Sequence, residues 1–117
     1  MKKHDLPGID QQKGLESVQG NVALYEKLLG KFVSQYNNAA QDLESFLAKG
    51  AHEEGLRLVH SIKGVAASLG MTELFCAANA LETEMINQSN NQDSRANFQF
   101  ELERVLQGLS AVQTVFN

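Results

Sequence analysis

His60 is the residue of this chain whose type and setting could do chemistry. On a helical wheel of about 100° per residue, the apolar residues of its segment lie between about 140° and 240° from it, so the ring is expected to point outward. These apolar residues are Leu58, Ile62, Val65, Ala66 and Leu69. A neutral imidazole is a good nucleophile, and its ordinary pKa of about 6.5 makes the neutral form available near pH 7.

The helix surface beside His60 is free of bulky side chains. Gly64 follows one turn later and Ala67 two turns later. A glycine inside a helix costs up to about 1 kcal/mol relative to alanine, and exposure to solvent does not explain that cost. The pattern therefore indicates that another backbone or a bulky group approaches His60 at this place.

The residues that flank this surface are suited to an anion. Lys63 and Arg57 place positive charge on either side of His60, and Leu56 adds an apolar contact on the same face. A nucleophilic imidazole, free space and two cations within three turns are the groups that phosphoryl chemistry requires.

Other catalytic and metal-binding motifs are absent from the sequence. It contains no glycine-rich phosphate loop, and the run His52-Glu53-Glu54 lacks the second histidine of a zinc-binding HExxH motif. No Glu-x-x-His pair is present, which disfavours a di-iron bundle. A haem or metal carrier is therefore only a weak alternative.

Helices must position His60, because the pattern predicts helices and no strand. We expect a short helix after Asp10 that ends at Gly20, one long helix from Asn21 to Gly50, and a helix from His52 to Leu69 that ends at Gly70. The apolar stripe of the long helix is Leu24, Leu28, Phe32, Tyr36, Ala39, Leu43 and Leu47.

Two further helices complete the prediction. Thr72 is expected to cap the first of them, and a polar loop at 87–94 precedes the second. The apolar residues of the last helix are Phe98, Leu102, Val105, Leu109, Val112 and Phe116. The predicted fold is all-α, an antiparallel up-and-down four-helix bundle with a short extra N-terminal helix.

Composition limits the class of protein further. The 117 residues allow one domain, and the net charge of −4 with a pI near 5.3 argues against a nucleic-acid binder. The one cysteine, Cys76, permits no internal disulfide and is expected to pack in the interior. Without an apolar run long enough for a membrane span or signal peptide, we expect a monomer in the cytoplasm that makes no membrane contact.

The run from His60 to Gly70, followed by Leu74 and by Leu81-Glu82, resembles the signature of histidine-containing phosphotransfer (HPt) domains of multistep phosphorelays. The lead-in from Gly8 to Tyr25 resembles that of HPt domains at the end of hybrid sensor kinases. This predicts an arm or linker at 1–8 and an HPt domain at 9–117, and it allows the chain to be the cytosolic part of a membrane-anchored kinase.

The resemblance implies a phosphoryl carrier and no autokinase. His60 would accept the group from a receiver-domain aspartyl phosphate and pass it to the aspartate of another receiver, while Lys63 neutralises charge on the group. The carrier would have no cofactor of its own, and Mg²⁺ would lie on the receiver. The predicted docking face consists of Leu56, Arg57, Lys63, Gly64, Ala67 and Ser68.

Glu82 is expected to lie beside His60. His60 lies nine residues before Leu69, and Glu82 lies ten residues after Thr72, so antiparallel packing brings the two to one height. In the family a Gln or Glu here bonds the imidazole Nδ1, which would leave Nε2 free. The alternative function is a non-catalytic adaptor that docks a receiver domain through the same face.

Overall fold

The polypeptide folds into helices joined by short turns. The computed structural model describes the backbone of residues 6–116 and the side chains of residues 6–111, and the described part of the chain contains no strand. The helices are α1 (Gln11–Glu16), α2 (Val22–Tyr36), α3 (Ala39–Ala48), α4 (His52–Leu69), α5 (Thr72–Ile86) and α6 (Gln92–Phe116).

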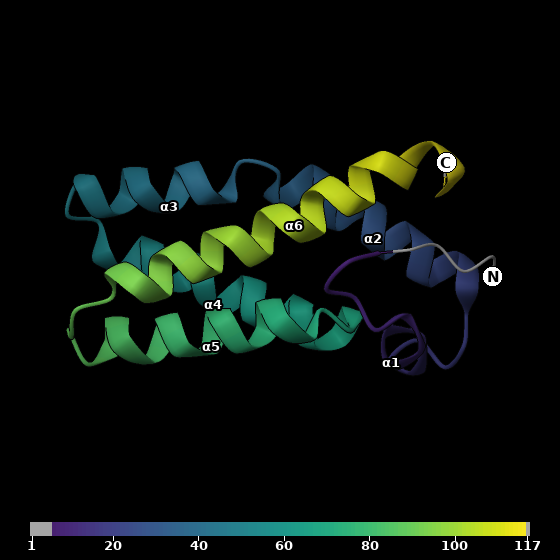
Figure 1. The fold of residues 1–117 in the computed structure, drawn as a ribbon, viewed down its shortest axis with the longest axis horizontal. Coiled ribbons are helices and arrows are strands. Elements are labelled where there is room, and N and C mark those ends of the chain that lie inside the picture. The colour runs from purple at the N-terminus through teal and green to yellow at the C-terminus, as the bar shows by residue number, and fades with distance from the viewer. Residues whose placement is uncertain (1–5, 117) are drawn as a thin grey trace.

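Four antiparallel legs form the bundle, and α1 covers one end of it (Figure 1). The first leg consists of α2 and α3, and α4, α5 and α6 are the others. Each leg contacts the next, and α6 returns to contact α2. The predicted all-α bundle with a short N-terminal helix is confirmed, and none of the described helices is long and apolar enough to cross a membrane.

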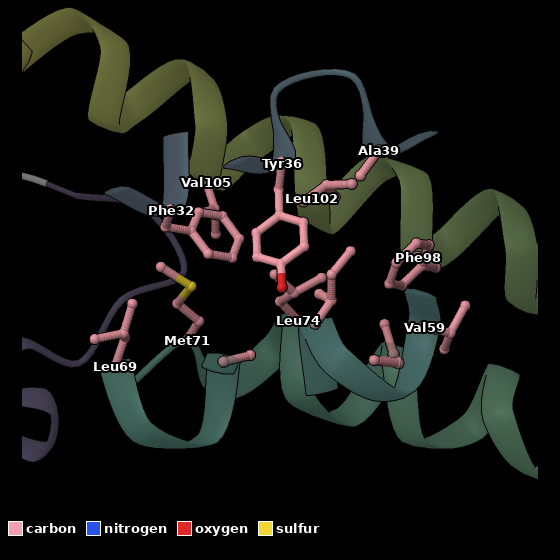
Figure 2. Packing of buried hydrophobic residues seen from close by; sticks show 14 of the residues in the cluster. Phe32, Tyr36, Ala39, Val59, Leu69, Met71, Leu74, Phe98, Leu102 and Val105 are labelled. Carbon is pink, nitrogen blue, oxygen red and sulfur yellow. The ribbon is translucent and has the colours of Figure 1, made fainter. Parts of the chain in front are cut away.

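The core of the bundle is apolar and well filled. Phe32 and Tyr36 of α2 pack ring to ring, with centroids 5.1 Å apart, and face side chains of the other legs in Figure 2. The fully buried side chains with the largest volumes include Tyr25, Phe98, Leu29, Leu43, Ile62, Met71, Leu74, Leu81, Met85, Leu102 and Leu109. Burial of such side chains stabilises the fold by about 1.5–3 kcal/mol each.

The prediction of one continuous helix between Asn21 and Gly50 is wrong. The helix breaks at Asn37 and Asn38, where Asn38 adopts φ −111° and ψ 13°. Asparagine side chains compete with the backbone for hydrogen bonds, so two in succession weaken a helix. The break lets α2 pack against α6 while α3 packs against α4.

The buried face of α2 also differs from the predicted stripe. The core receives Tyr25, Leu29 and Val33, whereas Leu24 is 40% exposed and Leu28 is only half-buried. The predicted stripe is therefore displaced by one residue at the start of α2. Two leucines that the sequence pattern assigns to the core lie at the surface or its edge.

Three smaller expectations are also corrected. Thr72 is the first residue of α5 and not its cap, because Met71 holds the cap position and makes no side-chain cap hydrogen bond. α6 begins at Gln92, before the end of the predicted loop, and Cys76 is exposed on α5. The predicted core contacts of Val112 and Phe116 lie outside the described side chains.

The lead-in to the bundle packs against the end of α4. Gly70 ends α4 with φ +80°, a left-handed conformation that suits glycine. Its carbonyl accepts a hydrogen bond from the Asp10 N–H at 2.7 Å, and a Cβ on Gly70 would lie 2.1 Å from the Asp10 carbonyl oxygen. Leu6 is buried, so packing on the bundle begins before residue 9, while the domain boundary after residue 8 stays a prediction.

Tyr25 fixes α2 to the same end of α4. Its ring is fully buried, and its hydroxyl donates a 2.9 Å hydrogen bond to the carbonyl of Leu69. Burial, with the negative charge of Asp10 as a smaller cause, raises the pKa of Tyr25 to about 12. The hydroxyl therefore keeps its proton throughout the physiological range and satisfies one of the last carbonyl groups of α4.

We expect Tyr25→Phe to lower the free energy of unfolding by about 1–3 kcal/mol, because the buried Leu69 carbonyl loses its donor. Urea denaturation followed by circular dichroism measures this loss. The matched control is Tyr36→Phe, whose hydroxyl only accepts a 3.4 Å bond from the Gln35 side chain and should contribute less. Equal losses in the two variants would contradict this account of Tyr25.

Candidate functional site

His60 lies on the exposed side of α4, as the helical wheel predicts. Its side chain is 68% exposed, whereas Val59 and Ile62 on the other side of the helix are fully buried. The helix around it is regular because the apolar residues recur at helical spacing and Gly70 ends the helix cleanly. The ring is therefore held on a rigid element and open to solvent.

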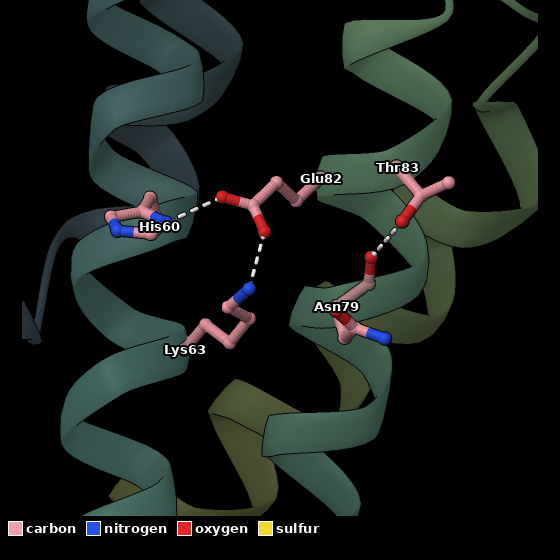
Figure 3. A network of polar contacts seen from close by, with 5 residues as sticks. All are labelled: His60, Lys63, Asn79, Glu82 and Thr83. Atoms are coloured by element: carbon pink, nitrogen blue, oxygen red, sulfur yellow. Dashed lines mark hydrogen bonds and ion pairs between the residues drawn. The ribbon is translucent and has the colours of Figure 1, made fainter.

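Glu82 of α5 lies beside His60 and joins it to Lys63 (Figure 3). One carboxylate oxygen, Oε2, lies 2.5 Å from His60 Nδ1, and the other, Oε1, lies 2.6 Å from Lys63 Nζ. The Glu82 side chain is only 11% exposed. The antiparallel packing of α4 and α5 brings these three sequence-predicted residues together, while their roles in transfer stay predictions.

The Lys63 ammonium lowers the pKa of Glu82 below its ordinary value. Its hydrogen bond is the largest cause, the bond from His60 acts in the same direction, and burial opposes both. Glu82 is therefore ionised at neutral pH. An ionised carboxylate can only accept hydrogen bonds, so Nδ1 of His60 carries the proton.

This hydrogen bond leaves the other ring nitrogen of His60 ready to react. In a neutral imidazole with its proton on Nδ1, Nε2 has a free lone pair. Figure 3 shows the second ring nitrogen on the side of the ring away from Glu82 and Lys63. The geometry thus presents a nucleophilic nitrogen to solvent while the opposite edge of the ring is fixed.

We expect the Glu82 contacts to stabilise the fold at neutral pH and to be lost in acid. Because its folded pKa lies below the ordinary value of 4.5, the stabilisation is present above pH 4.5 and disappears as the pH falls through the folded pKa. Glu82→Gln should lower the free energy of unfolding by about 1–3 kcal/mol at pH 7, and the difference from wild type should shrink below pH 4.5.

Urea denaturation at a series of pH values measures this difference. The exposed carboxylate of Glu103 on α6 offers the control variant Glu103→Gln, for which we expect no comparable loss at pH 7. If the deficit of Glu82→Gln stayed constant from pH 7 to pH 3, the carboxylate would not stabilise the fold through its charge.

The small residues next to His60 form an open surface. Gly64, Ala67 and Ser68 are all exposed, and a Cβ built on Gly64 would meet no atom within 4 Å. Packing within the described part of the chain therefore does not require glycine at this position. Gly14, in contrast, packs against Leu69 and Tyr25 so closely that a Cβ would lie 2.5 Å from both.

A groove of about 630 Å³ runs between α2 and α4 and begins at His60. Phe32 and Tyr36 contribute apolar surface to it, and Lys31 supplies positive charge. Its lining is completed by Leu28, Gln35, His60, Ser61, Gly64, Val65, Ser68 and Leu69. Among the residues that the structure describes, no carboxylate lines this groove, although the protein as a whole has a net charge of −4.

The site predicted from the sequence does not include the α2 residues that line this groove. Leu28, Lys31 and Gln35 line it, but the helical periodicity assigned Leu28 to the core and gave no reason to place either polar residue in the site. A signal was present in the sequence: α2 carries more leucines than one buried stripe needs. This excess of leucines can be interpreted only once the buried face of α2 is known.

Two residues of the predicted docking face, Leu56 and Arg57, do not line the groove between α2 and α4. Arg57 is exposed and lines a second groove of about 300 Å³ near Phe46 and Glu54. Leu56 is half-buried and packs against the core, so it offers less exposed apolar surface than the wheel predicts. Among the described residues, no group of three or more His, Cys, Asp or Glu side chains could hold a metal ion.

The family follows from a comparison of the sequence with known proteins. The family model for the Hpt domain matches residues 27–114, which is well over half of the chain, so the protein belongs to the Hpt domain family. No curated protein and no solved structure matches the chain significantly. Hpt domains are phosphocarriers rather than kinases, and the family works with receiver domains in phosphorelays.

Proposed function

We propose that this Hpt domain carries a phosphoryl group on Nε2 of His60, between the aspartates of two receiver domains. The observation that carries the proposal is the fixed imidazole: Glu82 holds Nδ1 at 2.5 Å while the 68% exposed ring leaves Nε2 free. The match to the Hpt family supports the same reaction class.

The reacting groups of the first transfer are the imidazole of His60 and the aspartyl phosphate of the receiver. The lone pair of Nε2 attacks the phosphorus of the receiver's aspartyl phosphate, a nitrogen–phosphorus bond forms, and the bond to the aspartate oxygen breaks. The aspartate leaves as a carboxylate, and the ring keeps its proton on Nδ1. Positive charge that develops on the ring is stabilised by the adjacent Glu82 carboxylate.

The second transfer is the reverse reaction with another receiver. An aspartate oxygen attacks the phosphorus, the bond to Nε2 breaks, and the neutral imidazole with its Nδ1 proton is restored. No cofactor on this chain enters either step, and Mg²⁺ on the receiver would supply further charge stabilisation. Location in the cytoplasm and a monomeric state stay predictions.

The receiver is proposed to dock over Gly64 and the groove between α2 and α4. The groove is lined by Lys31 and by no carboxylate from the described part of the chain, which complements the acidic active site expected of a receiver. The open surface at Gly64, Ala67 and Ser68 allows a second backbone to approach His60. On this account α2 and α4 form the docking face together.

Labelling tests the proposed carrier directly. A receiver domain is phosphorylated with a radiolabelled small-molecule phosphodonor and incubated with the protein, and we expect acid-labile label on the wild type and none on His60→Gln. Incubation with labelled ATP alone should give no label. A stable complex with a phosphorylated receiver that never labels His60 would favour the adaptor function.

Gly64→Ala separates docking from stability. We expect the free energy of unfolding to stay the same or rise by up to about 1 kcal/mol, because alanine favours helix and its Cβ meets no atom. The transfer rate should fall about tenfold or more, since the added methyl group displaces the receiver from Nε2. Urea denaturation and the rate of labelling measure the two effects.

Gly30→Ala is the matched control for this variant. Gly30 also lies inside a helix where a Cβ would meet no atom within 4 Å, and it does not line the groove. It should gain similar stability and keep its transfer rate. If Gly64→Ala transferred as fast as Gly30→Ala, the open surface at Gly64 would have no part in docking.

A further inference from the structure

The ammonium group of Lys63 is engaged by Glu82 and lies on the far side of the ring from Nε2. Its Nζ lies 2.6 Å from Glu82 Oε1, and the Lys63 side chain is only 23% exposed. Figure 3 shows the lysine extending toward the carboxylate from one turn further along α4. In this structure Lys63 therefore contacts the group that orients His60 and not the nitrogen that would carry the phosphoryl group.

We propose that Lys63 is a positioning residue for His60 that acts through Glu82. By occupying Oε1 it leaves Oε2 as the acceptor for Nδ1, and so it keeps the imidazole proton on Nδ1 and the lone pair on Nε2. This inference rests on the proposed function, because the orientation matters only if Nε2 accepts the phosphoryl group.

The physical basis is the hydrogen-bonding capacity of a nearly buried carboxylate. Glu82 has two oxygens and two donors, and each oxygen receives one of them. The terminal torsion of a glutamate is soft, so one donor alone would not fix the orientation of the carboxylate plane toward the ring. Without Lys63, the other oxygen would lose its donor in a site that is 11% exposed, which costs free energy and favours rearrangement.

Charge supports the same role. The lysine hydrogen bond is the largest cause of the lowered pKa of Glu82, so Lys63 keeps the carboxylate ionised and able only to accept. A protonated Glu82 could donate to Nδ1 and would then place the imidazole proton on Nε2. Lys63 therefore disfavours the tautomer in which the reactive nitrogen is blocked.

Arg57 provides a matched comparison on the same helix. Lys63 lies three residues after His60 and Arg57 three residues before it, so each lies about one turn from the ring. Arg57 is exposed and forms no ion pair with any residue that the structure describes. A general electrostatic effect on His60 should be similar for the two cations, whereas an effect through Glu82 belongs to Lys63 alone.

The test measures the imidazole tautomer in the free protein, without a receiver. The ¹⁵N chemical shifts of the two ring nitrogens give the ratio of the Nδ1–H to the Nε2–H form at a pH where the ring is neutral. We expect Lys63→Met to lower this ratio about threefold to tenfold, the effect of weakening one charge-assisted hydrogen bond. Lys63→Arg should restore most of it, and Arg57→Met should leave the ratio unchanged.

A double variant shows whether the effect passes through the carboxylate. In a Glu82→Gln background the lysine no longer pairs with a charge, so adding Lys63→Met should change the ratio less than twofold. An unchanged ratio in Lys63→Met alone, or an equal fall in Arg57→Met, would overturn the proposal. So would a full effect of Lys63→Met in the Glu82→Gln background.

The rate of labelling from a phosphorylated receiver tests whether the orientation of His60 by Lys63 affects transfer. Lys63→Met should slow labelling at least in proportion to the fall in the fraction of rings that hold the proton on Nδ1, and Lys63→Arg should recover it. If wild-type His60 takes no label at all, the proposed carrier function fails while the tautomer result still decides the role of Lys63. If the fraction of rings in the Nδ1–H form falls but labelling is unchanged, Lys63 orients the ring without any part in transfer, and the proposal fails.

Discussion

The carboxylate of Glu82 is nearly buried between α4 and α5 and accepts a hydrogen bond from each of two side chains of α4. A charge in this position is stable only if its partners are present and correctly placed, because an unpaired buried charge is costly. The requirement favours the register of α5 against α4 that the structure shows. The exposed, oriented imidazole of His60 is the result of that register.

The register in turn depends on the tight connection between the two helices. Gly70 ends α4 in a left-handed conformation, and α5 begins two residues later at Thr72. The lead-in segment holds this end of the bundle through Asp10 and Tyr25, which satisfy carbonyl groups at the end of α4. A part of the chain far from His60 in sequence therefore maintains the geometry of the site.

The glycines on α1 and α4 have opposite roles. Gly70 and Gly14 lie where neighbouring atoms leave no room for a Cβ, so their small size is required by the fold. Gly64 lies where a Cβ would meet nothing, so its small size contributes no packing and lowers helix propensity. Stability explains the first two glycines, and the proposed approach of a receiver domain would explain the third.

Local patterns predicted much of the architecture, and their failures have a common cause. Helix periodicity located α4 and α5 and the outward direction of His60, and the caps at Asp10 and Asn21 are as expected. The same periodicity passed through Asn37 and Asn38 without detecting the break, because apolar residues keep helical spacing on both sides of it. The helical spacing of apolar residues shows which residues share a face of a helix. It does not show whether the helix is continuous.

The sequence by itself determined the family and the helical class and indicated His60 as the candidate histidine, because these depend on residue type and on spacing within one helix. The tertiary structure decided which α2 residues face the groove and where the Lys63 ammonium lies. Those contacts join residues of different helices, and their geometry depends on how the whole bundle packs. From the sequence alone, a lysine close to a histidine could pair with any of several groups. The packing of α4 against α5 places the Lys63 ammonium on the carboxylate of Glu82.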